Sequence, residues 1–264
     1  MEKMFEELEG KVAVITGSGG GLGRGICTKL AQFGIKVIGL DIDEHAGKAT
    51  RDLIQNSGGK AFFEKVDLTD DKDIERAFKK IRTNISDRID ILVNNAGFVQ
   101  PKSLLNTSKD NWNKTININL TAPFFCIQQV VGQMADQGYG KIVNISSRSG
   151  VVGSSGYAAY SASKFGVIGL TQCVADEYAK DAINVNAICP GIIFTQMWDN
   201  QLDDYIALRG GDPSDIKEKF RKKIPMQRLQ TEEDIANAVL FLISDMSKNI
   251  TGHTLLVTGG YPMS

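Results

Sequence analysis

The stretch KVAVITGSGGGLGRGICTKLAQFG, residues 11–34, decides the fold. It begins with a short apolar run, continues through the glycine-rich TGSGGGLG of residues 16–23, and passes directly into a segment of helical period. Glycines let a backbone turn sharply and approach a pyrophosphate, and a helix N-terminus presents free N–H groups and a positive dipole end. This order predicts a dinucleotide-binding βα unit, with a merely flexible turn as the alternative. The expected cofactor contacts in the loop are Gly17, Gly21, Leu22 and Gly23.

The rest of the chain repeats the same alternation of short Val- and Ile-rich runs with longer segments of helical period. Such alternation is typical of βα units that build a parallel sheet. We therefore expect an α/β fold of the Rossmann type, a doubly wound, seven-stranded parallel sheet in a single domain over residues 1–264. The expected strands are 11–17, 36–42, 61–68, 90–97, 141–147, 184–191 and 254–260. The expected helices are 21–33, 44–57, 70–85, 108–136, 157–180 and 231–244.

One long connection interrupts this pattern at about residues 195–230, where aromatic residues, glycines and charges are mixed. A connection of that length in a compact domain is usually functional, so we expect a lid over the substrate. It contains the basic cluster KEKFRKK at 217–223, for which a solvated helix face is a better explanation than an anion site because acidic residues partly neutralise it.

Composition points to a small-molecule partner. Thirty Lys and Arg residues against 31 Asp and Glu residues give a net charge of -1, which provides no general field to attract nucleic acid or an anionic membrane. The acidic N-terminus lacks the apolar core of a signal peptide, and no later run is apolar enough to span a bilayer, so we expect a cytoplasmic protein. Four scattered cysteines and two histidines predict no metal site.

Asp41, at the end of the second expected strand, lies 18 residues beyond Gly23. A carboxylate at this place accepts hydrogen bonds from an adenosine ribose and repels a 2'-phosphate. No Arg or Lys stands beside it or in the glycine loop, so NAD(H) is expected rather than NADP. An ordinary polar strand end is the alternative.

Tyr160 and Lys164 are one helical turn apart in YSASK, residues 160–164. Interconversion of an alcohol and a ketone needs a hydride acceptor and a base for the hydroxyl proton. A free tyrosine titrates near pH 10, and a nearby ammonium and an oxidised nicotinamide would both favour the phenolate. Taken alone, such a pair is more often a buried ring beside a solvated lysine stem.

These motifs, with NNAG (94–97), NISS (144–147) and PGIIFT (190–195), make the chain resemble the short-chain dehydrogenase/reductase family over essentially its whole length. The resemblance implies that Tyr160 is the general acid/base and that Ser147 orients the substrate oxygen. It implies that Lys164 and Asn119 complete a tetrad, the asparagine holding a water beside the lysine. Tyr160 and Lys164 are also counted among the cofactor contacts.

The resemblance extends to the rest of the cofactor site and to assembly. It implies contacts of Asp67 and Leu68 with the adenine, of Asn95 near the adenosine ribose, and of Ile193 with the nicotinamide amide. It further implies that helices 108–136 and 157–180 form a dimer interface, usually within a homotetramer.

Four residues are expected to contact substrate: Ser149 and Tyr157 by position, and Met197 and Trp198 on the lid, where simple lid packing is the alternative. The lid and several motifs are similar to those of polyol, sugar-alcohol and diol or acetoin dehydrogenases. We therefore expect an NAD-dependent oxidoreductase acting on a polyol, a sugar, a sugar acid or phosphate, or a vicinal diol. The alternatives are a 3-oxoacyl-thioester reductase, which would normally use NADPH, and a non-catalytic NAD(H)-binding sensor.

Overall fold

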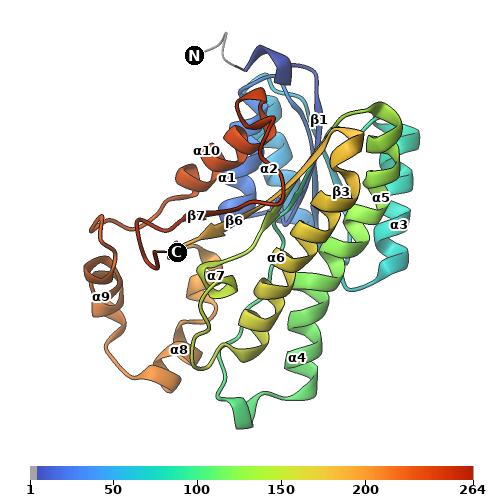
Figure 1. Cartoon of the computed structure of the whole chain (residues 1–264). Coiled ribbons are helices and arrows are strands. Elements are labelled where there is room, and N and C mark those ends of the chain that lie inside the picture. The colour runs from blue at the N-terminus through green and yellow to red at the C-terminus, as the bar shows by residue number, and fades with distance from the viewer. Residues whose placement is uncertain (1–4, 264) are drawn as a thin grey trace.

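The sheet organises the computed structural model, which describes residues 5–263 (Figure 1). Seven strands lie in the order β3-β2-β1-β4-β5-β6-β7, and every neighbouring pair is parallel. The predicted fold class is confirmed. The strands are β1 (Val12–Thr16), β2 (Lys36–Asp41), β3 (Ala61–Lys65), β4 (Ile91–Asn94), β5 (Gly140–Ile145), β6 (Ile183–Pro190) and β7 (Thr254–Val257).

Most strands end a few residues earlier than the sequence predicts. Leu68, Asn95 and Ser147 were expected inside strands, but each lies just after one. The chain leaves the sheet at these points, so the side chains turn away from the ladder and become available at its carboxyl edge. Strand β1 lies between β2 and β4, and the direction in which the chain winds across the sheet reverses at β1. Ligands bind at this reversal point in doubly wound sheets.

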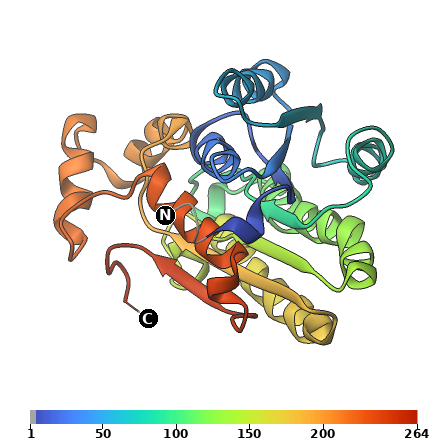
Figure 2. The ribbon, with the colours of Figure 1, turned by 90° about the horizontal axis from the view of Figure 1, so that it is seen from above.

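Helices cover both faces of the sheet (Figures 1 and 2). Helices α1 (Gly21–Ala31), α2 (Glu44–Asn56) and α10 (Glu232–Ile243) pack on one face, and α3 (Asp71–Asn84), α5 (Ala122–Gln137) and α6 (Ala158–Tyr178) pack on the other. The interior strand β1 is buried along its whole length, which explains the apolar run Val12–Ile15.

The expected helix 108–136 is not one regular helix. It consists of α4 (Lys109–Ile116), a π-helical segment at Asn117–Thr121, and α5. In the π-helical segment the Ala122 N–H donates to the Asn117 carbonyl, one residue further back than in an α-helix. Pro123 has no N–H to donate to the Asn119 carbonyl, so the regular ladder cannot continue through this point. Single π-turns of this kind are often found at functional sites.

The connection at 195–230 is folded. It contains α7 (Gln196–Asp199), α8 (Leu202–Arg209) and α9 (Ile216–Lys223), and these orange helices stand to one side of the sheet in Figure 2. A separate apolar cluster holds it together, in which the Trp198 ring lies 4.9 Å from Phe194 and 5.3 Å from Phe220. Trp198 is only 9% exposed and is the centre of this packing.

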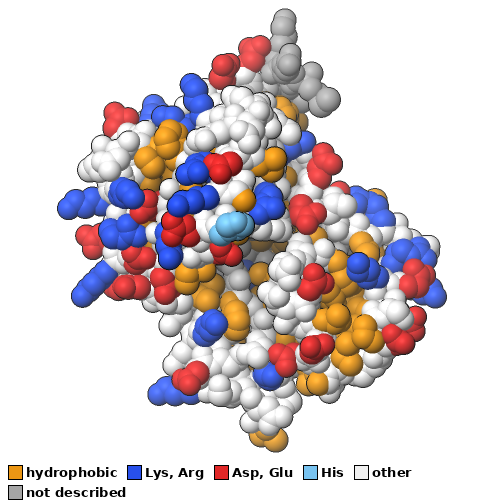
Figure 3. Space-filling view, turned by 180° about the vertical axis from the view of Figure 1, so that it is seen from behind, with side chains coloured by type: hydrophobic (Ala, Val, Ile, Leu, Met, Phe, Trp, Pro, Cys, Tyr) orange, Lys and Arg blue, Asp and Glu red, His pale blue; other side chains and the backbone are white. Residues whose placement is uncertain are grey.

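Charges of both signs are mixed over the face shown in Figure 3. Within residues 5–263, every helix is too short or too polar to span a bilayer.

Candidate active site

A cleft of about 1480 Å³ lies at the carboxyl edge of the sheet. Residues that follow β1 to β6 line it, together with residues of the 195–230 segment. Among the predicted site residues, Asn119 alone does not line this cleft. The predicted residues that do line it are Gly17, Gly21, Leu22, Gly23, Asp41, Asp67, Leu68, Asn95, Ser147, Ser149, Tyr157, Tyr160, Lys164, Ile193, Met197 and Trp198.

The glycine loop forms a cradle that side chains would fill. Gly17 and Gly21 have φ of +66° and +48°, a region that favours glycine. A Cβ on Gly23 would lie 1.9 Å from the Gly17 carbonyl oxygen, and a Cβ on Gly17 would lie 2.8 Å from the Ala96 Cα. Glycine is therefore needed for the loop to pack on itself and on the segment after β4. The loop leads into α1, whose first N–H groups have no side-chain cap and can meet a pyrophosphate, which fits a dinucleotide.

Asn95 holds this loop from behind. Its Nδ2 donates to the Thr16 carbonyl at 3.0 Å and to the Gly17 carbonyl at 3.2 Å. The side chain predicted to lie near the adenosine ribose thus joins the end of β4 to the glycine loop, while it also lines the cleft.

Asp41 is fixed by backbone donors. Its Oδ2 accepts from the Gly19 N–H at 2.7 Å, and its Oδ1 accepts from the Asp43 N–H at 2.9 Å. Arg24, which sequence reasoning missed, donates from Nη2 to the Gly19 carbonyl at 2.6 Å and from Nε to Thr50 Oγ1 at 3.1 Å. The guanidinium is thereby committed to the loop, and Arg24 is not among the residues that line the cleft.

Asp67 and Leu68 lie at the same end of the cleft, after β3. The Asp67 carboxylate accepts from the Thr69 N–H at 2.8 Å and from the Thr69 hydroxyl at 2.7 Å. Beside them the exposed Ile42 offers an apolar surface. A carboxylate and apolar side chains together suit an adenosine.

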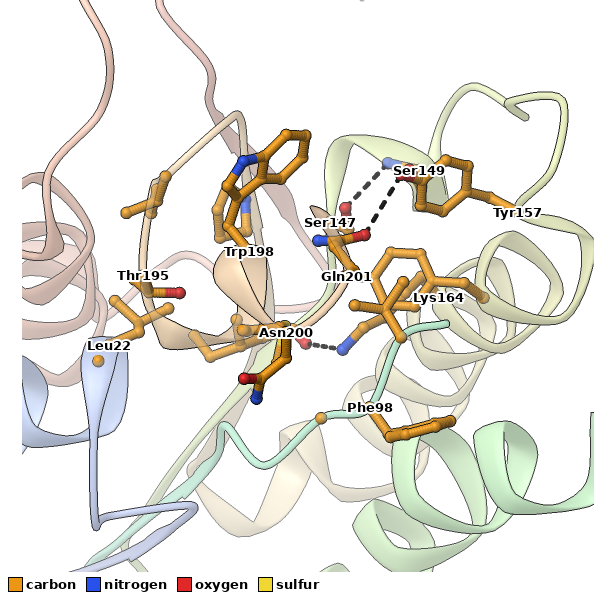
Figure 4. A pocket seen from close by; sticks show the side chains of 18 of the residues that line it. Leu22, Phe98, Ser147, Ser149, Tyr157, Lys164, Thr195, Trp198, Asn200 and Gln201 are labelled. Carbon is orange, nitrogen blue, oxygen red and sulfur yellow. Dashed lines mark hydrogen bonds between the residues drawn. The ribbon is translucent and has the colours of Figure 1, made fainter. Parts of the chain in front are cut away.

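Lys164 is buried at the other end, with 3% of its surface exposed. Its Nζ donates to the Ile145 carbonyl at 2.8 Å, the dashed line from Lys164 in Figure 4, and lies 5.8 Å from the centroid of the Tyr160 ring. Burial lowers the pKa of Lys164 to about 8. The ammonium therefore remains mostly charged at neutral pH, but at a cost in solvation.

Burial dominates the environment of the Tyr160 phenol. It raises the pKa above the ordinary value, against the lowering effects of a hydrogen bond with Ser147 and of the positive charge of Arg148. The expected lowering depends on Lys164 together with the charge of an oxidised nicotinamide, so it stays a prediction for the protein with bound cofactor.

Ser147 follows β5 in extended backbone and faces the cleft (Figure 4). Its Oγ accepts from the Ser149 N–H at 3.1 Å, which leaves the hydroxyl proton available. Ser147, Tyr160 and Lys164 come together where β5 ends and α6 begins.

Asn119 lies behind this group in the π-helical segment and is 1% exposed. Its side chain pairs with both backbone polar groups of Phe98 and donates to Ser163 Oγ at 3.1 Å. Asn119, Lys164 and Met197 all approach Gly97. A Cβ on Gly97 would lie 3.5 Å from Asn119 Oδ1, 3.8 Å from Lys164 Nζ and 3.6 Å from Met197 Cε. Met197 thus reaches from α7 to the end of β4.

The substrate end of the cleft contains a contact that the sequence did not reveal. The Tyr157 hydroxyl donates a hydrogen bond to Gln201 Oε1 at 3.2 Å (Figure 4). This bond joins the start of α6 to the 195–230 segment. Tyr157 and Tyr160 also pack edge to face, with ring centroids 6.3 Å apart. Burial raises the pKa of Tyr157, so its phenol stays protonated.

The basic cluster 217–223 mostly faces solvent, as expected. Arg221 and Lys222 pair with Glu218, at 2.7 Å and 3.7 Å. Lys223 is the exception, because it lines the cleft.

Comparison with known proteins agrees with this geometry. A family model described as "Enoyl-(Acyl carrier protein) reductase" matches residues 17–262. A 3-oxoacyl-[acyl-carrier-protein] reductase FabG of Aquifex aeolicus is 39% identical over 255 residues, covering 96% of this chain and 98% of the relative. The chain belongs to the short-chain dehydrogenase/reductase family. FabG of Escherichia coli is 38% identical over 255 residues, covering 97% of this chain and 98% of its own length.

Solved structures of other family members share the whole fold. A variant of actinorhodin polyketide ketoreductase with NADPH has a TM-score of 0.93 at 29% identity, covering 97% of this chain and 98% of that chain. A Beutenbergia cavernae protein, named as a candidate NAD(P)-dependent gluconate 5-dehydrogenase with bound NADP, has a TM-score of 0.88 at 32% identity, with the same two coverages. The predicted family is confirmed, and the protein is an oxidoreductase that acts on CH–OH or keto groups with a nicotinamide cofactor.

Proposed function

We propose that this short-chain dehydrogenase/reductase transfers hydride between NAD(H) and a secondary alcohol or ketone, with Ser147, Tyr160 and Lys164 as its catalytic residues. The observation that carries the proposal is the convergence of these three side chains in the cleft that also contains the glycine cradle. The bound nicotinamide supplies or accepts the hydride.

The chain's own residues handle the oxygen and its proton. Ser147 donates its hydroxyl hydrogen to the substrate oxygen and so fixes the reacting carbon. Tyr160 gives its proton to that oxygen during reduction and removes it during oxidation. Lys164 places a buried positive charge beside the phenol, which favours the phenolate left after proton donation. Asn119 positions this group through Phe98 and Ser163.

The choice of NAD(H) rests on Asp41. Two backbone N–H groups hold its carboxylate at the cleft, where it would repel a 2'-phosphate. Arg24 could attract a 2'-phosphate, but its guanidinium already donates to the Gly19 carbonyl and to Thr50 Oγ1. The names of the two similar structures contain NADPH and NADP, which makes NADPH the competing hypothesis.

Two substrate classes have support. The names of the curated relatives favour 3-oxoacyl thioesters over the polyols that the sequence first suggested. A sugar acid stays as the second candidate because basic side chains line the substrate end of the cleft and because a similar structure is named for a gluconate dehydrogenase.

A substrate panel tests the proposal. Acetoacetyl N-acetylcysteamine thioester, gluconate, a polyol and a vicinal diol would each be followed by nicotinamide absorbance with both cofactors. We expect turnover that is faster with the NAD pair. An enzyme that turns over only with the NADP pair would contradict the cofactor assignment, and tight NADH binding without turnover of any compound would favour the sensor hypothesis.

We also propose assembly as a homotetramer, or as a dimer, through α4, α5 and α6. Large apolar side chains are exposed on these helices, with Trp112 and Phe124 each 42% and Phe165 46% exposed. Exposed apolar side chains that form a contiguous patch mark interaction surfaces. Light scattering coupled to gel filtration would give the mass, and a monomer would contradict the proposal.

A further inference from the structure

Arg148 is a cation at the catalytic serine that the proposed chemistry does not use. It follows Ser147 directly, begins a 3-10 turn at Arg148–Gly150, and lines the cleft. Its guanidinium carbon lies 4.7 Å from the centroid of the Tyr261 ring, and its buried Nε has no hydrogen-bond partner within residues 5–263. A buried donor without an acceptor is costly, so such a group is expected to meet one when ligand is bound.

The position of Arg148 relative to the reacting atoms is constrained. Neighbouring Cα atoms are 3.8 Å apart, so Arg148 cannot be far from Ser147. Its guanidinium also lowers the pKa of both Tyr157 and Tyr160, and all three residues line the same cleft as Ser147. An acceptor on Arg148 would thus lie in the cleft that holds the carbon addressed by Ser147 and Tyr160.

Charge is divided along the cleft. The nucleotide end contains the carboxylates Asp41 and Asp67. The substrate end contains Arg148, Arg209 and Lys223, and its one lining carboxylate, Asp204, is paired with Lys102 at 2.7 Å.

Arg148 differs from the other cations of the cleft because it has a buried donor that lacks an acceptor within residues 5–263. Arg209 already donates from Nη2 to the Ser155 carbonyl at 2.7 Å. Lys223 lies over the Phe220 ring, 5.8 Å from its centroid. A guanidinium stacked on an aromatic ring is oriented in advance and can bind an oxyanion with two parallel hydrogen bonds.

We propose that Arg148 determines specificity by binding a carboxylate or phosphate that the substrate carries within a few bonds of its reacting carbon. This inference rests on the proposed alcohol–ketone chemistry and narrows its substrate class. It favours oxo acids, sugar acids and sugar phosphates over neutral polyols, and over thioesters, whose nearest charge is far from the keto group.

Matched substrates provide the test. Acetoacetate carries one negative charge that its methyl ester lacks, and dihydroxyacetone phosphate carries about two at neutral pH that dihydroxyacetone lacks. For each pair the ratio of kcat/KM, charged over neutral, would be measured at fixed ionic strength for the wild type, Arg148→Gln, Arg148→Lys and Lys222→Gln. Lys222 is the control because its side chain is 71% exposed and it does not line the cleft.

We expect a wild-type ratio above one for at least one pair, a fall of about 10- to 100-fold in Arg148→Gln, and partial recovery in Arg148→Lys. Lys222→Gln should keep the wild-type ratio. The pair that responds identifies carboxylate or phosphate as the ligand. A wild type that prefers both neutral compounds, or an Arg148→Gln variant that slows both members of a pair equally, would overturn the inference.

Binding separates this inference from the proposed function. If the wild type reduces no ketone with either cofactor, the proposed function fails, and calorimetry with malonate and with inorganic phosphate still tests Arg148. Binding of one of these anions that weakens at least tenfold in Arg148→Gln would uphold an anion site. No binding, or equal binding to both proteins, would overturn it.

Discussion

Asn119 and Phe98 are joined by a double hydrogen bond. The Phe98 N–H donates to Asn119 Oδ1 at 2.7 Å, and Asn119 Nδ2 donates to the Phe98 carbonyl at 2.8 Å. The same amide donates to Ser163 Oγ, whose hydroxyl donates to the Tyr160 carbonyl at 2.7 Å. One buried side chain thus joins the loop after β4 to the first turns of α6, which contain the catalytic pair.

Asn119→Ala should therefore affect both folding and turnover. It leaves two partly buried backbone groups of Phe98 unpaired, so we expect the free energy of unfolding to fall by about 1–3 kcal/mol. We also expect kcat to fall at least about tenfold, because Tyr160 and Lys164 lose a positioning contact. Urea unfolding and steady-state kinetics measure the two effects. Asn117→Ala, at an exposed position of the same π-helical segment, is the control, and an Asn119→Ala protein that matches it would refute the role.

Tyr160→Phe should separate chemistry from binding. Loss of the phenolic hydroxyl removes the proton donor, and general acid–base groups typically contribute about 10²- to 10⁴-fold, so we expect kcat to fall by that amount. The affinity for NADH, from fluorescence titration, should change little. Tyr157→Phe serves for comparison, since it loses only the bond to Gln201 and should mainly raise KM. Equal kcat values for the two variants would exclude Tyr160 as the acid.

The sequence predicted the strands and the glycine loop because these depend on local patterns. The run KVAVITG shows burial on both faces, and the positive φ values of Gly17 and Gly21 can be anticipated from the TGSGGGLG motif. The catalytic side chains Ser147, Tyr160 and Lys164 were predicted from the motifs that resemble those of the family.

Contacts between distant segments were beyond such reasoning. Arg24 reaches the loop, Gln201 reaches Tyr157, and Asn119 reaches Phe98 only in three dimensions. The raised pKa of Tyr160 likewise depends on how much water the fold excludes, which a one-turn spacing from Lys164 does not reveal. The packing of Trp198 on Phe220, which is 22 residues away along the chain, was likewise not visible in the sequence.

Asp41→Asn should relax the choice of cofactor. The neutral side chain keeps one acceptor for the loop N–H groups but no longer repels a 2'-phosphate. We expect the ratio of kcat/KM for NADPH over NADH to rise about tenfold or more. Asp43→Asn, which retains an acceptor for the Ala46 N–H at the start of α2, should leave the ratio unchanged. A ratio that stays constant in Asp41→Asn would show that Asp41 does not select the cofactor.

Lys164 should make stability depend on pH in a specific window. Its pKa is about 8 in the folded protein, whereas an unfolded lysine titrates near about 10.4. Between these values the unfolded chain retains a proton that the folded chain has released. The free energy of unfolding should therefore gain up to about 3 kcal/mol from this group as pH rises from 8 to about 10.4.

Lys164→Met removes that contribution, while the tyrosines and cysteines that titrate in the same range remain in both proteins. The difference in unfolding free energy, wild type minus variant, should thus increase with pH from 8 to about 10.4 and then level off. Urea unfolding at half-unit steps of pH measures it. Lys109→Met, at an exposed position of α4, should show a flat difference. A flat difference for Lys164→Met as well would mean that burial does not disfavour its charge, and the lysine could then stabilise the Tyr160 phenolate without the solvation cost inferred from the structure.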